Sequence, residues 1–327
     1  MTDSANAPQP LTPAMRLRAR VAMVIVGLLV VTVAVLLPVV LFSLGWSLQE
    51  VQDNPVYNLI TGELEANLEA LEGDDVAYGN ITIQAIDEST RAVTLLIAGN
   101  RVCTTFCPAI SFGLYSLDND GAMRRGLPPS ATVEFAAGAE GTGPFSKTIT
   151  LPVAGNPQRY PFDSYTLLLG LSASATRPDG RVFSVPPDMF TRGAALTVQN
   201  TMVRLKMTSL ELVDPQTVMP KGTNETLLAA ERIVFTRPIY LQILCSLLVL
   251  LISASGFFAL ATQTLRQLSI GIGGLILGIW GVRSIVIQGN LPEVTVVDSM
   301  LAIIILILLL GVAVRVALAV RAQTGWE

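Results

Sequence analysis

The distribution of apolar residues constrains this chain most. One long apolar run lies near the start, three more lie near the end, and a polar stretch separates them. Each run has about the 20 apolar residues that a helix needs to cross a bilayer. Within lipid, every backbone N–H and C=O must be satisfied inside the segment, which favours helices. The sequence therefore predicts four transmembrane helices, at residues 21–46, 238–261, 268–288 and 296–320.

Basic residues flank these runs unevenly. Three arginines precede the first run within residues 16–20, Arg266 lies in the connection between the second and third runs, and Arg321 follows the last. The connection between the third and fourth runs contains Glu293 and no basic residue. Because basic residues favour the cytoplasmic side, we expect a multi-pass protein of the plasma membrane with both termini inside. The cytoplasmic tails are residues 1–20 and 321–327, and the extracytoplasmic domain is residues 47–237.

The first run also has a second interpretation, as a cleaved signal peptide. Its apolar stretch is longer than the core of such a signal, and no cleavage site of small residues follows it cleanly. We therefore interpret the run as an anchor.

Composition argues against several classes of function. The chain contains no histidine, so histidine-based nucleophile systems and histidine metal sites cannot be built from it. We expect a non-enzymatic protein without cofactor or metal. The net charge of −4 is too small to indicate nucleic acid or an anionic lipid surface as the main partner. The expected partners are the lipid bilayer and either another protein or further copies of the chain.

The polar stretch is predicted to be rich in β-strands. Short runs with period-2 alternation or many β-branched residues are separated by turns that contain Gly, Pro, Asn or Asp. Such a pattern is typical of an antiparallel β-sandwich. The fold class is therefore a membrane protein that combines this extracytoplasmic sandwich with four helices. The expected strands are Asn80–Ile86, Val93–Ile97, Ser111–Leu117, Ala131–Phe135, Lys147–Leu151, Ser164–Leu171, Leu196–Val213 and Glu231–Phe235.

Two cysteines, Cys103 and Cys107, lie on the expected extracytoplasmic side, where disulfides persist. In a regular strand, residues four positions apart are about 13 Å apart, too far to bridge. A disulfide therefore requires a turn or bulge between them, which the following Pro108 favours. We expect the two cysteines to be joined.

The most distinctive local motif is Tyr160-Pro161-Phe162-Asp163. Pro161 favours an extended Tyr160, and Asp163 can cap a turn. A structural interpretation makes the motif a corner whose aromatic side chains fill the core. A functional interpretation makes it a loop that couples the outer domain to the membrane helices.

Arg283 is the charged residue within the third predicted helix, about five residues or roughly 8 Å from its outer end. One interpretation is that the guanidinium extends to the lipid headgroups. The other is a pair with an acidic residue such as Glu293, Asp298 or Glu231, because intramembrane charges tend to be paired. Asp298, near the start of the last predicted helix, is the partner we favour.

Several of these features together resemble a known family. Tyr160–Asp163, Arg237-Pro238 before the second predicted helix and Arg283 in the third are similar to the family called domain of unknown function 4436. The resemblance implies an N-terminal anchor, an outer domain and three further helices. It implies no activity, because the family has none established.

A second resemblance is to pentameric ligand-gated channels, through the Pro-Phe-Asp loop, the three C-terminal helices and the Leu291-Pro292 turn. It implies that residues 268–288 line a pore in a homo-oligomer. Those channels carry a fourth helix after the third, whereas this chain carries its extra helix at the front. The expected function is therefore a non-enzymatic membrane protein whose outer domain binds a partner or scaffolds an assembly. A ligand-sensing channel subunit is the alternative.

Overall fold

The structure is a computed structural model, and it describes residues 23–24, 27, 30–31, 34–45, 55–64, 76–107, 109–117, 130–135, 138–177, 179–186, 194–218, 226–262, 265–286 and 294–324. The described part is rich in β-sheet and also contains helices. The chain divides into two compact units. The β-unit consists of Leu44–Pro238 and Asn290–Glu293, and the helical unit consists of Met1–Ser43, Ile239–Gly289 and Val294–Glu327.

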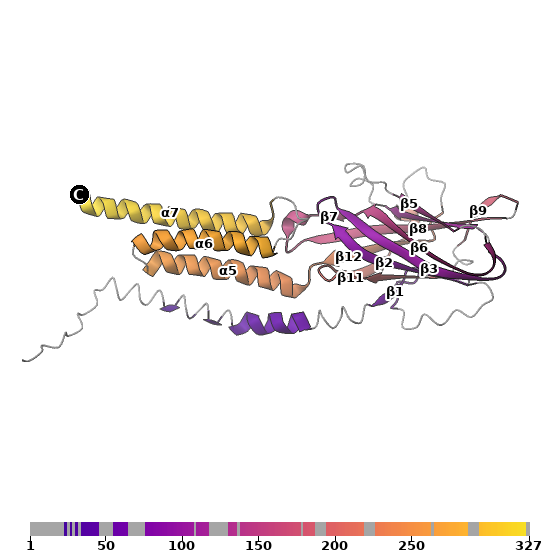
Figure 1. Cartoon of the computed structure of the whole chain (residues 1–327), viewed down its shortest axis with the longest axis horizontal. Helices are drawn as coiled ribbons and strands as arrows, with labels where there is room; N and C mark the ends of the chain where they lie inside the picture. Colours follow the sequence, from indigo (N-terminus) through magenta and orange to yellow (C-terminus); the bar gives the residue numbers. More distant parts are fainter. Residues whose placement is uncertain are drawn as a thin grey trace, which may run out of the picture. The chain divides into compact units, whose positions relative to one another are not determined.

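Two sheets form the β-unit (Figure 1). The first has the strand order β1-β10-β2-β3-β6, and the second has the order β11-β12-β8-β4-β5, with β7 and β9 also pairing with β8. The strands are β1 (Val56–Asn58), β2 (Val76–Asp87), β3 (Ala92–Cys107), β4 (Ala109–Ser116), β5 (Ser130–Phe135), β6 (Gly138–Pro152), β7 (Ala154–Gly155), β8 (Ser164–Thr176), β9 (Val182–Ser184), β10 (Ala194–Asn200), β11 (Lys206–Leu212) and β12 (Ala229–Thr236).

The two sheets share one hydrophobic core. Alternate residues of the strands are buried, as in Ile81 and Ile83 of β2 and Leu167 and Leu169 of β8. This period of two places every second side chain on the same face of a strand. The alternation that predicts strands in the sequence therefore also marks the core-facing residues.

The structure corrects two predictions about the strands. Leu196–Val213, predicted as one strand, forms β10 in the first sheet and β11 in the second. The predicted sandwich was purely antiparallel, but β10 lies parallel to β2, with Leu196 opposite Gly79. The prediction of direction was wrong because period-2 alternation is the same for parallel and antiparallel neighbours. Residues 201–205 separate the two strands and cross from one sheet to the other.

In the helical unit, α5 (Ile239–Thr262), α6 (Leu265–Val286) and α7 (Val296–Thr324) pack against one another. In the β-unit, the short helices η1 (Pro157–Arg159) and α4 (Pro215–Val218) lie between strands. A Cβ at Gly256 of α5 would lie 2.6 Å from the side chain of Leu308, and one at Gly311 of α7 would lie 2.9 Å from that of Leu260. These two glycines let α5 and α7 approach closely.

The glycines of α6 behave differently from those of α5 and α7. A Cβ at Gly273, Gly274, Gly278 or Gly281 would meet no described atom within 4 Å. The packing of α6 against the described residues therefore does not require these four glycines.

Two helices of the described residues are long and apolar enough to cross a membrane, Ile239–Leu260 and Val296–Arg321. Their side chains are mostly exposed, with only 17% and 6% of the most apolar stretch buried. Two shorter apolar helical stretches, Ala34–Gly45 and Gly271–Gly281 of α6, lie within the other two predicted spans. Part of the first predicted span, residues 21–46, lies outside the described residues. Four crossings therefore stay a prediction.

Candidate functional site

A buried arginine marks the point at which the β-unit passes into the first long helix. Arg237 lies between the last residue of β12, Thr236, and the first residue of α5, Ile239. Only 4% of its surface is exposed. Pro238 follows it and restricts its backbone to an extended conformation. Because a buried charge is costly unless it is paired, the partners of Arg237 define the site.

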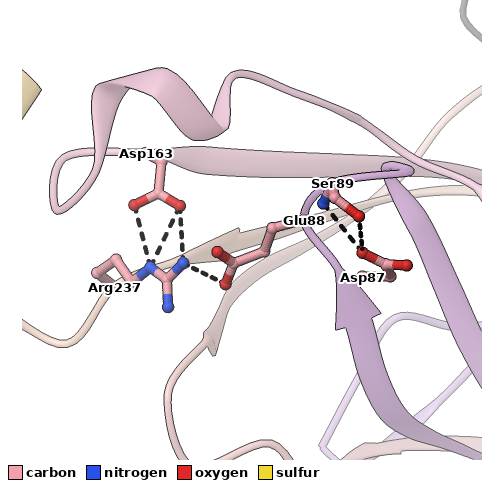
Figure 2. Close-up of polar contacts among 5 residues, drawn as sticks. All are labelled: Asp87, Glu88, Ser89, Asp163 and Arg237. Carbon is pink, nitrogen blue, oxygen red and sulfur yellow. Dashed lines mark hydrogen bonds and ion pairs between the residues drawn. The ribbon is translucent and has the colours of Figure 1, made fainter. Parts of the chain in front are cut away.

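Carboxylates from two other segments pair with this arginine (Figure 2). Asp163 lies directly before β8, and its Oδ1 and Oδ2 accept from Arg237 Nε at 3.0 and 3.2 Å. Nη2 also donates to Asp163 Oδ2 at 3.0 Å. Glu88, in the turn between β2 and β3, accepts from the same Nη2 through Oε1. This paired geometry is among the strongest hydrogen-bonding arrangements in proteins.

Local sequence explains why Glu88 is placed here. Asp87 accepts from the backbone N–H of Ser89 at 3.0 Å and from its hydroxyl at 2.7 Å, which forms a tight turn (Figure 2). Although partial burial raises the pKa of Asp87, hydrogen bonds from Ser89 and Thr90 hold it below the ordinary value. The turn ends at Arg91, which has a left-handed backbone with φ of 52°. Glu88 is thereby directed toward Arg237.

The segment before β8 supplies an aromatic face as well as Asp163. Asn156 caps η1 by accepting from the backbone N–H of Gln158 at 3.2 Å. Tyr160 follows, and its ring centroid lies 4.9 Å from the guanidinium carbon of Arg237. A guanidinium over an aromatic ring gains a cation–π attraction that is stronger where water is excluded. We call Glu88, Tyr160, Asp163 and Arg237 the Arg237 cluster.

The cluster keeps its arginine charged. Burial lowers the pKa of Arg237, but the hydrogen bonds and negative charges of Asp163 and Glu88 outweigh this, so the pKa lies above its ordinary value. Burial raises the pKa of Glu88 against the opposing charge of Arg237. Asp163 is 1% exposed, so the ion pair is almost closed to water. Such an arrangement is suited to holding together the segments of the β-unit that it joins.

The predicted motif is split between the core and the surface. Tyr160, Pro161 and Asp163 are buried, whereas Phe162 is 51% exposed. The interpretation in which both aromatic residues fill the core is therefore wrong for Phe162. Sequence reasoning noted Arg237 only as part of an Arg-Pro pair and did not propose Glu88. Its position between a predicted β-strand and a long apolar run could have marked Arg237 as a candidate site residue.

The second predicted charge pair lies in the helical unit, and the structure places its two side chains in contact. Arg283 Nε, in the last turn of α6, donates to Asp298 Oδ1. Asp298 also accepts from the backbone N–H of Thr295 at 2.9 Å, and its own N–H donates to the Thr295 hydroxyl at 3.3 Å. These reciprocal bonds form a capping box at the start of α7. The ring of Trp280 lies 5.6 Å from the Arg283 guanidinium.

We expect the Arg283–Asp298 pair to stabilise the contact between α6 and α7. In a double-mutant cycle with Arg283→Gln and Asp298→Asn, the coupling should exceed about 0.5 kcal/mol, because the two side chains are in direct contact. The measurement is the unfolding of the purified protein in detergent. Arg283→Gln combined with Glu211→Gln, an exposed residue of the β-unit, is the control and should be additive. Additivity for the first pair would contradict the interaction.

The backbone around the predicted disulfide is irregular. Between Cys103 and Phe106 the register of β3 against β6 shifts, as Cys103 lies opposite Gly141 and Phe106 lies opposite Ala139. Three residues of β3 thus span two of β6, which is a β-bulge. The side chains of Cys103 and Cys107 lie outside the described residues. Their disulfide stays a prediction.

A carboxyl group is buried in the β-unit without a hydrogen bond. Glu231 of β12 is 1% exposed, and neither of its carboxyl oxygens has a hydrogen-bond partner among the described residues. It lies two residues before the core residue Ile233 and is opposite Leu169 of β8. Burial raises its pKa to about 9. Glu231 is therefore protonated at neutral pH.

The described residues contain no group of three or more Cys, Asp or Glu side chains that could hold a metal ion. Among the described residues, ion pairs occur in the interior at Arg237 and at the surface between Arg232 and Glu211.

The fold and this cluster define a class, a β-sheet-rich protein that continues into long apolar helices. A family described as "Domain of unknown function (DUF4436)" matches residues 126–213, so the chain is similar to that family over this part. The match includes Tyr160 and Asp163 and ends before Arg237. No curated protein matches the chain.

Proposed function

We propose that the chain is a non-enzymatic integral membrane protein whose β-unit lies outside the membrane and binds a partner or scaffolds an assembly. The two sheets of the β-unit would form a sandwich. The exposed apolar side chains of α5 and α7 support a lipid environment, because a soluble protein buries such residues. Leu306 is 67% exposed and Leu310 is 64% exposed in α7. In water these surfaces would be unfavourable.

The proposed topology has four crossings and both termini in the cytoplasm of a plasma-membrane protein. The arginines before residue 21, Arg266 and Arg321 would lie inside, and residues 47–237 would lie outside.

The Arg237 cluster is the observation that carries this proposal. Arg237 is two residues before α5, and it is fixed by Asp163 and Glu88 from two other segments of the β-unit. The segment that leads into α5 is therefore fixed within the β-unit. A buried ion-paired site of this kind fits a structural role, because a catalytic group must reach its substrate.

The mass of the purified protein in mild detergent tests the partner or scaffold function. One chain has a mass of 34.9 kDa. We expect a complex that contains several copies or a second protein, as measured by light scattering and native mass spectrometry. Arg232→Gln, which changes an exposed ion pair, is the control and should leave the mass unchanged. A single chain in several mild detergents would contradict the proposal.

A ligand-sensing channel subunit is a second candidate, in which residues 268–288 line a pore. The direct pairing of Asp163 with Arg237 favours it, because a movement of the 160–163 loop would reach the start of α5. A channel of this kind requires a homo-oligomer. Liposomes that contain the purified protein should then show an ion flux across their membrane. A homo-oligomer without flux would leave the scaffold function.

A further inference from the structure

The end of the β-unit that holds Arg237 has a distinctive surface. We call it the basal end and define it by residues 87–91, 156–163, 201–206 and 236–237. Several contacts bring these segments together. Arg237 pairs with Glu88 and Asp163, and Lys206 lies opposite Thr236 in the sheet. The backbone N–H of Thr201 donates to the Ile83 carbonyl in β2, the strand that leads into the turn of residues 88–91.

Two loops of the basal end share the same pattern of side chains. In the first, Arg159 is exposed and Phe162 is 51% exposed, with the Phe162 N–H donating to the Arg159 carbonyl at 2.8 Å. In the second, Val203 is 52% exposed beside the exposed Arg204. Each loop thus presents an exposed apolar side chain and an exposed arginine within a few residues of sequence. A surface that combines exposed apolar side chains with exposed arginines is suited to the boundary between water and hydrocarbon.

The charge of the basal end is positive. Its described residues include five basic side chains and three acidic ones, and Arg237 engages two of the acidic ones, Glu88 and Asp163. Arg204 lies close enough to Glu88 for its charge to lower the pKa of that carboxyl. The basal end therefore matches a negatively charged partner, although the whole chain has a net charge of −4.

The position of the basal end in the chain identifies that partner. Arg237 is two residues before α5, whose stretch Ile239–Leu260 is long and apolar enough to cross a bilayer. Two residues span only about 7 Å, so a membrane crossed by α5 places Arg237 at the level of the headgroups. Phosphate groups and the upper acyl chains are found at that level, and they suit guanidinium and apolar side chains respectively.

We propose that the basal end is a lipid-binding surface, on which Phe162 and Val203 insert into the bilayer interface and Arg159 and Arg204 bind headgroup phosphates. This inference rests on the proposed function as an integral membrane protein. It adds a second attachment of the β-unit to the membrane, independent of the covalent link to α5. Anionic phospholipids are the preferred occupants because of the positive charge.

The depth of the two loops tests the apolar part. The full chain, with its three cysteines replaced by alanine, carries a fluorescent label at Phe162→Cys or Val203→Cys in lipid nanodiscs. Nitroxide-labelled headgroups should quench both labels, and aqueous iodide should quench them weakly. A label at Asp179→Cys, beyond the opposite end of β8, is the control and should show the reverse. Labels at 162 and 203 that behave like the control, or that neither quencher reaches, would overturn the proposal.

The charges are tested by the lipids that the protein retains. Native mass spectrometry compares bound phosphatidylglycerol with bound phosphatidylcholine for Arg159→Gln and Arg204→Gln. Each change should reduce the preference for the anionic lipid about fivefold. Arg181→Gln, an exposed arginine beyond the far end of β8, should have no effect. An unchanged preference in both variants would overturn the phosphate sites. If carbonate washing released this protein from membranes, that result would instead contradict the proposed function as an integral membrane protein.

Discussion

Replacing Arg237 with glutamine is expected to destabilise the protein by about 3–5 kcal/mol, because the change leaves buried carboxylates without their cation. Asp163 is 1% exposed and loses three hydrogen bonds, and the Glu88 side chain, which is 12% exposed, loses its ion pair. The remaining charges would repel each other in a site that is poor in water. The measurement is denaturant unfolding of the full chain in detergent.

Two further variants separate this effect from a general loss of charge. Arg232→Gln removes an exposed arginine that lies 3.4 Å from Glu211, and such pairs contribute about 0–1 kcal/mol. Adding Asp163→Asn to Arg237→Gln should recover part of the lost stability, because the double variant no longer has an unpaired carboxylate at position 163. Arg237→Lys should be less stable than the parent protein, because an ammonium cannot donate the pair of hydrogen bonds that a guanidinium donates to a carboxylate. Equal losses for Arg237→Gln and Arg232→Gln would contradict the role of the cluster.

The second large effect concerns the pH dependence of stability and Glu231. Its pKa is about 9 in the folded protein against an ordinary value of 4.5. The folded state therefore holds a proton that the unfolded state has lost between these two values. The stability contributed by the protonated form is complete below about pH 4.5 and is lost as the pH rises toward about 9. The slope is about 1.4 kcal/mol per pH unit within this window.

Glu231→Gln should remove this contribution, because the amide is neutral at every pH and has a similar shape. Between pH 5 and pH 8 the parent protein should lose roughly 4 kcal/mol more stability than the variant. The experiment compares the free energy of unfolding of the two proteins in detergent at several pH values. Glu134→Gln, at an exposed position of β5, is the matched control and should follow the parent. Parallel pH curves for parent and Glu231→Gln would show that Glu231 is not buried and protonated.

The sequence predicts the positions of most strands, because their alternation reflects burial on one face. It does not predict how strands are distributed between sheets. Leu196–Val213 has a continuous pattern, yet it is divided at residues 201–205, where Asn200 accepts from the Met202 N–H at 3.1 Å. The short strands β1, β7 and β9 were not predicted, since two or three residues carry no periodicity.

The two charged sites differ in how far the sequence could define them. Arg283 and Asp298 are 15 residues apart, on either side of one short connection, so the pair could be proposed from the order of the helices. Arg237 is 74 residues from Asp163 and 149 from Glu88 in the sequence. Only the pairing of β12 with β8 and the turn after β2 bring these three residues together. Contacts of that range depend on sheet topology, which local patterns do not specify.

Cysteine labelling of intact cells tests the central claim, that the β-unit lies outside the membrane and the chain enters the membrane after Arg237. In a chain without its native cysteines, a membrane-impermeant maleimide should react with Asp179→Cys in the β-unit. It should react with Gln263→Cys, between α5 and α6, only after the cells are permeabilised. Labelling of position 263 in intact cells, or protection of position 179, would contradict the proposed topology and the membrane role of the Arg237 cluster.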